Sequence, residues 1–343
     1  MGYAAAMRAI EQRAIDDRAA ARTRWAASTG VDSAEVWADQ LRTAGRLTVN
    51  FHPDRIGRSG RSVAAGLLAD GAYRSQWATG TSSGSRSALF GGERHRFERE
   101  FFAGAYDDLD ADVGERPVYG AFDLVVDDLG GSPRLGSSFL VLRSHVRDRT
   151  TMCVGDTHAA PHDLGTFDEP WSILAGLAEQ AARGELLDRG LGVDVLLAVI
   201  GSQWPPRSTS RELDGYVEIQ VHGGVSLAED VEAIVLDPSF RGTAVERDVA
   251  AAAVRYGLEL AWHRGSALAV DDVPDDFRGP TMPVLARRVA GPSGIVDARA
   301  IGVAANAEAY EEPTPLGDPP DSAPQQLKYL WHTLLRYGHD AES

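Results

Sequence analysis

Apolar positions near the N-terminus repeat with the spacing of a helix. Residues 3–28 are rich in Ala and Arg and keep this period, which predicts one long helix. Asp32 or Ser33 can cap a second, shorter helix that ends at Leu41, because either side chain can accept a hydrogen bond from the first helical turn. The pattern predicts a helical N-terminal extension over residues 1–45.

The first strand pattern is Arg46–Phe51, where β-branched and aromatic residues recur. Pro53 follows shortly afterwards, and proline cannot continue an interior strand because it lacks the N–H that a neighbouring strand needs. His52 is therefore predicted at the C-terminal end of this strand, a position where side chains often take part in binding or chemistry.

Strand and helix patterns then follow one another irregularly as far as residue 304. The predicted helices are Ser62–Leu68, Arg94–Phe102, Trp171–Leu187 and Thr243–His263, and the predicted strands are Tyr119–Val126, Ser137–Arg143, Val193–Ile200, Tyr216–His222 and Val231–Leu236. Val193–Ile200 is an almost unbroken apolar run, so we expect a central strand there. Because few strands alternate cleanly with helices, the order favours an α+β domain over 46–304, with mixed or antiparallel sheets that form a cleft.

The composition changes towards the C-terminus. Residues 305–326 are rich in Pro, Glu, Asp and Ala, which predicts an exposed linker. Residues 327–343 begin with LKYLWHTLLRYG, whose helical apolar spacing predicts a C-terminal helix that docks on the body of the protein.

Charge and composition narrow the class of protein. The formal net charge of −16 opposes nonspecific binding to nucleic acid or to anionic membranes. The segment from Arg55 to Arg99 is nevertheless locally positive, with eight arginines against three acidic residues, and suits an anionic small ligand. Cys153 is the single cysteine and no apolar run is long enough to cross a membrane. We expect a cytoplasmic protein, or an effector or toxin delivered from the cytoplasm.

The run from Leu47 to Tyr119 concentrates polar side chains and glycines, a composition better suited to lining a pocket than to building a core. The connection between its two predicted helices is longer than most connections, and long loops are often functional. Trp77 in this loop can stack on a base or on a nicotinamide ring. The candidate ligand-binding residues of the run are Tyr73, Arg74, Ser75, Gln76, Trp77, Thr81, Ser82 and Tyr119.

The predicted strand Tyr216–His222 sorts its side chains by face. Its valines and isoleucine fall on one face, and the opposite face carries Tyr216, Glu218, Gln220 and His222. All four polar types can position or polarise a ligand, and neither Lys nor Arg is among them. The alternative is an ordinary solvent-facing strand surface, which is common in antiparallel sheets.

Histidines and aspartates recur in a composition that a divalent metal could use. These residues are His52, Asp54, Asp156, His158 and His162. Their spacing contains no HExxH helix and no dense His/Asp signature, so a metal-dependent hydrolase is an alternative and no metal is expected in the leading interpretation.

The chain also resembles known families. The segments HPDR, YRSQWATGTSSG, RPVYGAFDL, YVEIQVHGG and LKYLWHTLLRYG resemble a bacterial family of a domain of unknown function, over roughly residues 46–338. A remoter resemblance is to the ADP-ribosyltransferase fold in its His-type branch, through a His at the end of an early strand, a Ser/Thr-bearing strand and a late strand with Glu. Such enzymes hold NAD in a cleft between two small sheets.

This second resemblance implies roles by position. His52 would hydrogen-bond the nicotinamide-side ribose, Ser137 or Ser138 would support the cleft, and Glu218 would act at the ribose. Cleavage of the nicotinamide–ribose bond develops positive charge on the ribose, which a fixed carboxylate stabilises. The chain departs from the family at Tyr216, where many members carry a second acid or a Gln, so the acceptor is open.

Three hypotheses follow from the sequence. The leading one is an enzyme of ADP-ribosyltransferase type that consumes NAD, a dinucleotide, and transfers ADP-ribose to an unknown acceptor or to water. The metal-dependent hydrolase is the rival enzyme. The third is a noncatalytic ligand- or protein-binding module, in which Glu218 and His52 would lie apart. Membrane and nucleic acid are not expected as partners.

Overall fold

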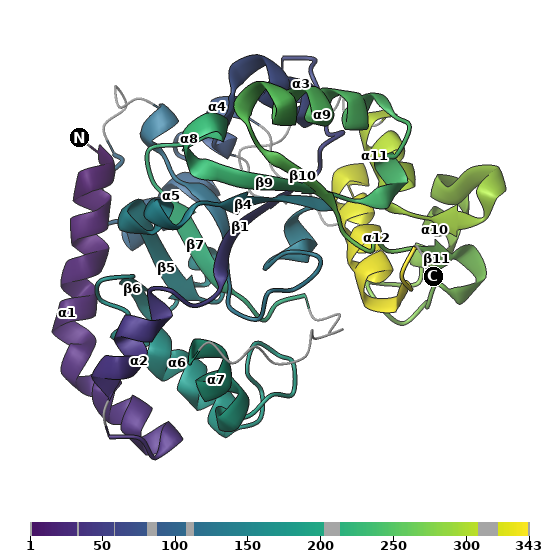
Figure 1. The fold of residues 1–343 in the computed structure, drawn as a ribbon. Coiled ribbons are helices and arrows are strands. Elements are labelled where there is room, and N and C mark those ends of the chain that lie inside the picture. The colour runs from purple at the N-terminus through teal and green to yellow at the C-terminus, as the bar shows by residue number, and fades with distance from the viewer. Residues whose placement is uncertain are drawn as a thin grey trace.

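The structure is a computed structural model that describes residues 2–32, 34–57, 59–80, 88–107, 113–201, 213–307 and 322–341. An eight-stranded sheet with the order β10-β9-β4-β1-β3-β7-β5-β6 forms its centre (Figure 1). Its neighbouring strands are antiparallel except for β9 and β10, which are parallel. The strands are β1 Arg46–Phe51, β3 Val118–Asp123, β4 Ser138–Leu142, β5 Thr150–Val154, β6 Leu164–Thr166, β7 Val217–Val221, β9 Val231–Leu236 and β10 Glu259–Trp262.

This sheet confirms the predicted α+β class and corrects one detail of the resemblance. In place of two small sheets there is one continuous sheet, accompanied by two short ribbons. One ribbon pairs β2 (Ala72–Tyr73) with β8 (Val225–Ser226), and the other pairs β11 (Leu268–Ala269) with β12 (Ile295–Val296).

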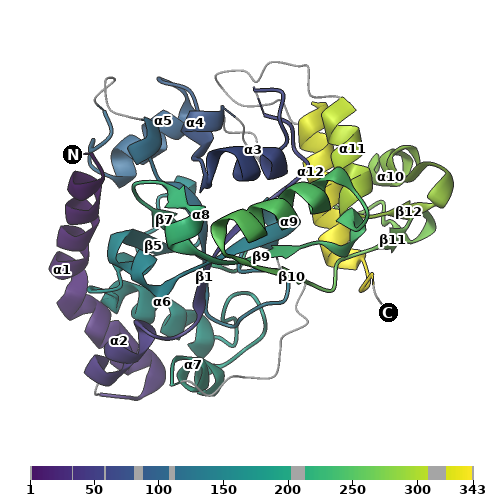
Figure 2. The ribbon, with the colours of Figure 1, turned by 45° about the horizontal axis from the view of Figure 1, so that its top comes forward.

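Helices cover both faces of the sheet (Figures 1 and 2). One face carries α2 (Ala34–Leu41), α6 (Trp171–Ala182) and α7 (Val193–Ile200). The other face carries α3 (Val63–Asp70), α4 (Gln76–Thr79), α5 (Glu93–Phe101), α8 (Leu227–Asp230) and α9 (Ala244–Tyr256).

The main hydrophobic core lies on the α6 side of the sheet. Val217, Ile219 and Val221 of β7 are fully buried there in one cluster with Ile173 and Leu174 of α6. Burial of an aliphatic side chain of this size stabilises the fold by about 1.5–3 kcal/mol. Because the apolar positions of β7 alternate, turning them to this core turns the polar positions of the same strand to the opposite face.

The N-terminal helix α1 (Gly2–Thr29) packs on α6 and on β6, the edge strand of the sheet (Figure 1). Arg24 ties it there through ion pairs of 2.8 Å to Asp163 and 2.7 Å to Glu179. An edge strand presents unpaired backbone groups, which a packed helix protects from pairing with other chains. The predicted helical extension therefore covers the β6 edge of the sheet.

At the other end, α10 (Met282–Ala290), α11 (Ala298–Ala307) and α12 (Ala323–Tyr337) pack beside the sheet (Figure 1). The predicted C-terminal helix does dock on the body, since Trp331 is 3% exposed and its Nε1 donates to the Pro133 carbonyl at 3.0 Å. The predicted linker over 305–326 was too long at both ends, because α11 and α12 extend into it. Residues 308–321 lie outside the described residues.

Two predicted elements were wrong. Val193–Ile200 is helix α7, bounded by Gly192 and Gly201, because a short apolar run fits a buried helix as well as a buried strand. The helix predicted as far as His263 ends at Tyr256, where Gly257 adopts a left-handed conformation with φ of 70°. The chain then forms β10 parallel to β9, so β9, α9 and β10 make a crossover unit. Among the described residues, no helix is both long and apolar enough to cross a membrane.

Candidate functional site

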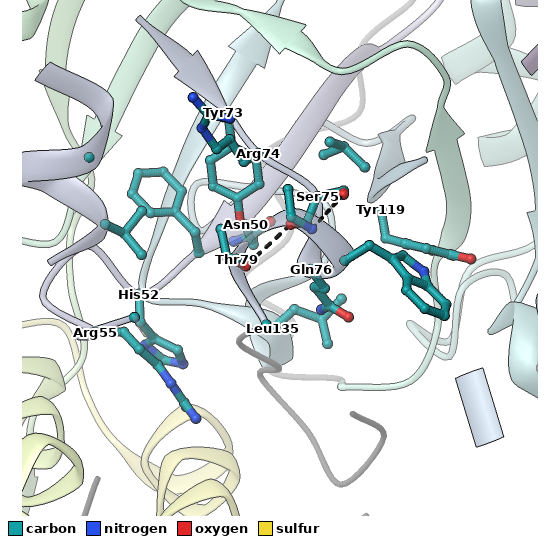
Figure 3. A pocket seen from close by; sticks show the side chains of 18 of the residues that line it. Asn50, His52, Arg55, Tyr73, Arg74, Ser75, Gln76, Thr79, Tyr119 and Leu135 are labelled. Atoms are coloured by element: carbon teal, nitrogen blue, oxygen red, sulfur yellow. Dashed lines mark hydrogen bonds between the residues drawn. The ribbon is translucent and has the colours of Figure 1, made fainter. Parts of the chain in front are cut away.

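A pocket of about 630 Å³ lies on the face of the sheet that carries α3, α4 and α5 (Figure 3). The sequence had predicted eight of its lining residues for binding or catalysis, from five elements of the fold: His52, Tyr73, Arg74, Ser75, Gln76, Trp77, Tyr119 and Glu218. Of the other predicted ligand-binding residues, Thr81 and Ser82 lie outside the described residues.

The described part of the predicted long loop contains β2 and α4. Tyr73 lies in β2 and packs against Phe51 with ring centroids 5.6 Å apart. Ser75 caps α4 by accepting a hydrogen bond from the Ala78 N–H, and Gly80 ends the helix with φ of 63°. In Figure 3 this segment crosses the middle of the pocket. The local capping residues thus fix the backbone that presents the Tyr73–Thr79 side chains.

Glu218 and His52 line the same pocket but lie towards different ends of it. Glu218 pairs with Ala121 on β3, which pairs with Thr48 on β1, and His52 lies four residues further along the chain. Two strand spacings across the sheet and four residues along it separate the two Cα atoms by about 16 Å. Figure 3 shows His52 and Arg55 beside the C-terminal helices and Tyr119 on the opposite side. A ligand that contacts both residues must be extended.

Glu218 is a buried carboxylate that the pocket reaches, with 4% of the residue exposed. Its Oε1 accepts hydrogen bonds from the Thr157 backbone N–H at 3.0 Å, from the Thr157 hydroxyl and from the Gln220 amide at 3.3 Å. Burial, and next the negative charge of Asp156, raise the pKa of Glu218 to about 7. The group therefore changes charge near neutral pH.

The polar face of β7 is not the solvated surface that the sequence left as an alternative. Tyr216 and Glu218 are each 4% exposed, and Gln220 and His222 are 0% exposed. The Tyr216 hydroxyl lies 3.5 Å from Glu218 Oε2. This face is instead a packed polar layer, with its pocket end at Tyr216 and Glu218.

Gln220 and His222 were predicted to bind ligand, and the structure places them behind the pocket. Gln220 donates to the Thr157 hydroxyl at 2.9 Å and accepts from Thr151 at 2.8 Å. His222 is hydrogen-bonded to the Tyr106 hydroxyl at 2.6 Å and to Thr151 at 3.0 Å. Burial lowers the pKa of His222 to about 3, so the ring is neutral. A sequence pattern shows which face a side chain takes but not how deep it lies.

Ser137 and Ser138 are not among the lining residues, although Ser138 pairs with the lining residue Phe51 across β1 and β4. Ser138 accepts a hydrogen bond from the Asp237 backbone N–H at 3.1 Å, and the Ser137 carbonyl is hydrogen-bonded to His263 at 2.7 Å. Both contacts hold the β4 end of the sheet. The strand between β1, which precedes His52, and β7, which carries Glu218, is β3, and its residue Tyr119 lines the pocket.

The residues of the predicted metal site do not come together. Asp54 lies against Gly302 of α11, whereas Asp156 and His158 line the pocket beside Glu218 and His162 is exposed. No three His, Cys, Asp or Glu side chains in the described part of the chain form a group that could hold a metal ion. The described structure therefore does not gather the residues on which the metal-dependent alternative was built.

Sequence reasoning missed Glu98, a carboxylate on α5 that holds the aromatic wall of the pocket. Trp77 Nε1 and the Tyr119 hydroxyl each donate to it at 3.0 Å, and Arg116 pairs with it at 2.8 Å. The Arg116 guanidinium also lies 3.9 Å from the centre of the Trp77 ring. The spacing of Arg94, Glu98 and Phe101 on one helix face could have indicated that Glu98 is buried.

The wall opposite Tyr119 combines a buried ring with positive charge. The ring of His52 packs edge-on against Trp331 of α12, with centroids 5.2 Å apart. Burial, and next the charge of Arg55, lower the pKa of His52 to about 3, so His52 is neutral.

The described lining contains three carboxylates, from Asp70, Asp156 and Glu218, against six basic side chains from Arg55, Arg61, Arg74, Arg94, Arg134 and Lys328. The pocket is thus more positive than the protein as a whole.

The fold and the pocket define an α+β protein whose sheet carries a large, partly basic pocket in the described part of the chain. Residues 46–337 match the family described as a protein of unknown function (DUF3626), and the chain belongs to this family. The match agrees with the sequence resemblance to a bacterial domain of unknown function. The gene 2 protein of Mycobacterium phage L5 is 26% identical over 133 residues, which cover 35% of this chain and 44% of the phage protein. The chain therefore spans less than half the length of that curated relative.

Proposed function

We propose that this protein cleaves the bond between nicotinamide and ribose in NAD and transfers ADP-ribose to an acceptor or to water. The observation that carries the proposal is a pocket whose described lining combines a buried carboxylate, Glu218, with aromatic and basic side chains. Loss of nicotinamide leaves positive charge on the ribose, and a fixed carboxylate beside that carbon stabilises the transition state.

The character of the lining suits a dinucleotide. Tyr73 and Tyr119 bring aromatic rings to the lining that can contact nicotinamide or adenine, and the basic side chains suit a diphosphate. The described pocket is also large enough for an extended ligand of this kind, since ligand pockets commonly measure about 300–1,000 Å³.

The separation of Glu218 and His52 does not fit the roles that the resemblance implied, in which both residues act at the nicotinamide-side ribose. We therefore assign the two residues to opposite ends of the ligand. Glu218 acts at the nicotinamide-side ribose, where the charge develops. His52, about 16 Å away and neutral, hydrogen-bonds a sugar hydroxyl in the adenosine half of the ligand. A neutral imidazole suits this task because it can both donate and accept a hydrogen bond.

The test is release of nicotinamide from NAD, measured by chromatography, for the wild type, Glu218→Gln and Glu232→Gln. Glu232 is exposed on β9 and is not among the lining residues, so it is the matched control. We expect a loss of about 10²–10³-fold in Glu218→Gln and no change in the control. Equal release in all three proteins would refute the role of Glu218. Binding of NAD without release in any of them would make the protein a binding module.

A further inference from the structure

The pocket holds a second pair of side chains with the arrangement of a catalytic base. His158 Nδ1 lies 2.7 Å from Asp156 Oδ1, and the same oxygen accepts the His158 backbone N–H at 3.1 Å. Both residues line the pocket. A carboxylate on Nδ1 places the proton on that nitrogen and leaves Nε2 with the lone pair that can accept a proton.

This pair is tied to Glu218 through the backbone. Asp156, Thr157 and His158 form one short turn, and it is the Thr157 backbone N–H that donates to Glu218 Oε1 at 3.0 Å. Since neighbouring Cα atoms are about 3.8 Å apart, His158 is anchored within about 8 Å of the Glu218 carboxylate. The imidazole and the carboxylate therefore act on the same part of a bound ligand.

Burial alone would raise the pKa of Asp156, but the hydrogen bonds from His158 and the nearby positive charge outweigh this effect and lower the pKa below its ordinary value. Asp156 therefore stays ionised and can orient the ring over the whole physiological range. The pair is about one third exposed, with side-chain exposures of 32% for His158 and 28% for Asp156, so an acceptor can reach it from solvent.

We propose that His158, positioned by Asp156, is the general base that activates the acceptor, and that the acceptor is water or a hydroxyl group. This inference rests on the proposed function. The acceptor oxygen forms a bond to the ribose carbon C1′ while its proton passes to His158 Nε2. The bond from C1′ to the nicotinamide nitrogen breaks, and its electron pair leaves with nicotinamide, which becomes neutral. His158 then returns the proton to solvent.

The experiment compares the wild type, His158→Gln, Asp156→Asn and a matched control, His145→Gln. His145 forms a similar pair with Asp230 at 3.2 Å, is 54% exposed and is not among the pocket-lining residues. Turnover of NAD is measured with water as acceptor and again with added sodium azide. Azide is an anion and needs no base, so it tests the proton-transfer step separately from folding and binding.

We expect His158→Gln to lose about 10²–10⁴-fold of its hydrolytic turnover and to regain turnover with azide, forming ADP-ribosyl azide. Asp156→Asn should show a smaller loss and the same recovery, because it keeps the base but loses its orientation. His145→Gln should behave as the wild type in both assays.

Three results would overturn the inference. Hydrolysis by His158→Gln at the rate of the His145→Gln control would show that no base is needed there. Loss of turnover by His158→Gln that azide does not restore would show that His158 maintains the structure of the pocket and does not act as a base. If the wild type releases no nicotinamide, both the proposed function and this inference are wrong. If the wild type releases nicotinamide, Glu218→Gln does not and His158→Gln still does, only this inference is wrong.

Discussion

The burial of Glu218 predicts that the residue proposed for catalysis destabilises the folded protein at neutral and alkaline pH. Burial, reinforced by Asp156, raises its pKa from an ordinary 4.5 to about 7. Between these two values the folded protein keeps a proton that the unfolded chain has lost. Stability due to this group is therefore fully present below pH 4.5 and is lost as the pH rises through 7.

The size of the effect follows from the shift. At about 1.4 kcal/mol per pKa unit, the complete loss is about 3 kcal/mol, of which about 2.5 kcal/mol falls between pH 5 and pH 8. Glu218→Gln keeps the shape of the side chain but has no charge, so this part of the pH dependence disappears. The free energy of unfolding of the variant, relative to the wild type, should rise by about 2–3 kcal/mol between those two pH values.

Urea unfolding of both proteins at pH 5 and at pH 8 gives the free energy of unfolding of the variant relative to the wild type at each pH, and so the change between the two pH values. Other groups with raised pKa values, such as Asp54, titrate in both proteins and cancel. The exposed Glu232→Gln variant is the control and should follow the wild type at both pH values. Parallel pH profiles for the wild type and Glu218→Gln would refute the claim that Glu218 is buried with a raised pKa.

Three further predictions test other parts of the account. Nicotinamide release should rise about tenfold per pH unit as the pH approaches 7 and then level off, because Glu218 must be ionised; a flat profile from pH 5 to 8 would contradict this. Trp77→Phe removes a donor to Glu98 and should lower the free energy of unfolding by about 1.5–3 kcal/mol in urea titrations. Gly120→Ala places a Cβ 2.3 Å from the Thr48 carbonyl oxygen and should cost at least about 1–3 kcal/mol, whereas Gly66→Ala, with no atom within 4 Å, should be neutral or stabilising.

The parts of the fold that could be predicted are those in which local pattern and tertiary context agree. Arg46–Phe51 was predicted with its observed limits, because proline ends the strand pattern. The two faces of β7 were predicted correctly, because apolar alternation leaves only one orientation towards a core. Val193–Ile200 was not predicted correctly, because an almost unbroken apolar run has too few polar positions to show the period of a strand or of a helix.

The sequence indicated many of the residues that line the pocket but not how deeply each side chain lies. The Tyr73–Trp77 segment and Glu218 stood out through chemistry and strand phase, and they line one pocket. The depth of Gln220 and His222 depends on α5 and on residues around Tyr106, which no local pattern connects to β7. The sequence showed Asp156 and His158 only as two residues of suitable type. Their closeness to Glu218 depends on the turn in which the Thr157 N–H donates to Glu218, and this contact could not be predicted from the sequence.

The most direct measurement is a crystal structure of the Glu218→Gln variant soaked with NAD. The account predicts a dinucleotide in the pocket, with the nicotinamide-side ribose carbon beside residue 218 and the adenosine half reaching towards His52. NAD bound elsewhere, or bound in the reverse direction with adenosine beside residue 218, would contradict the proposed chemistry.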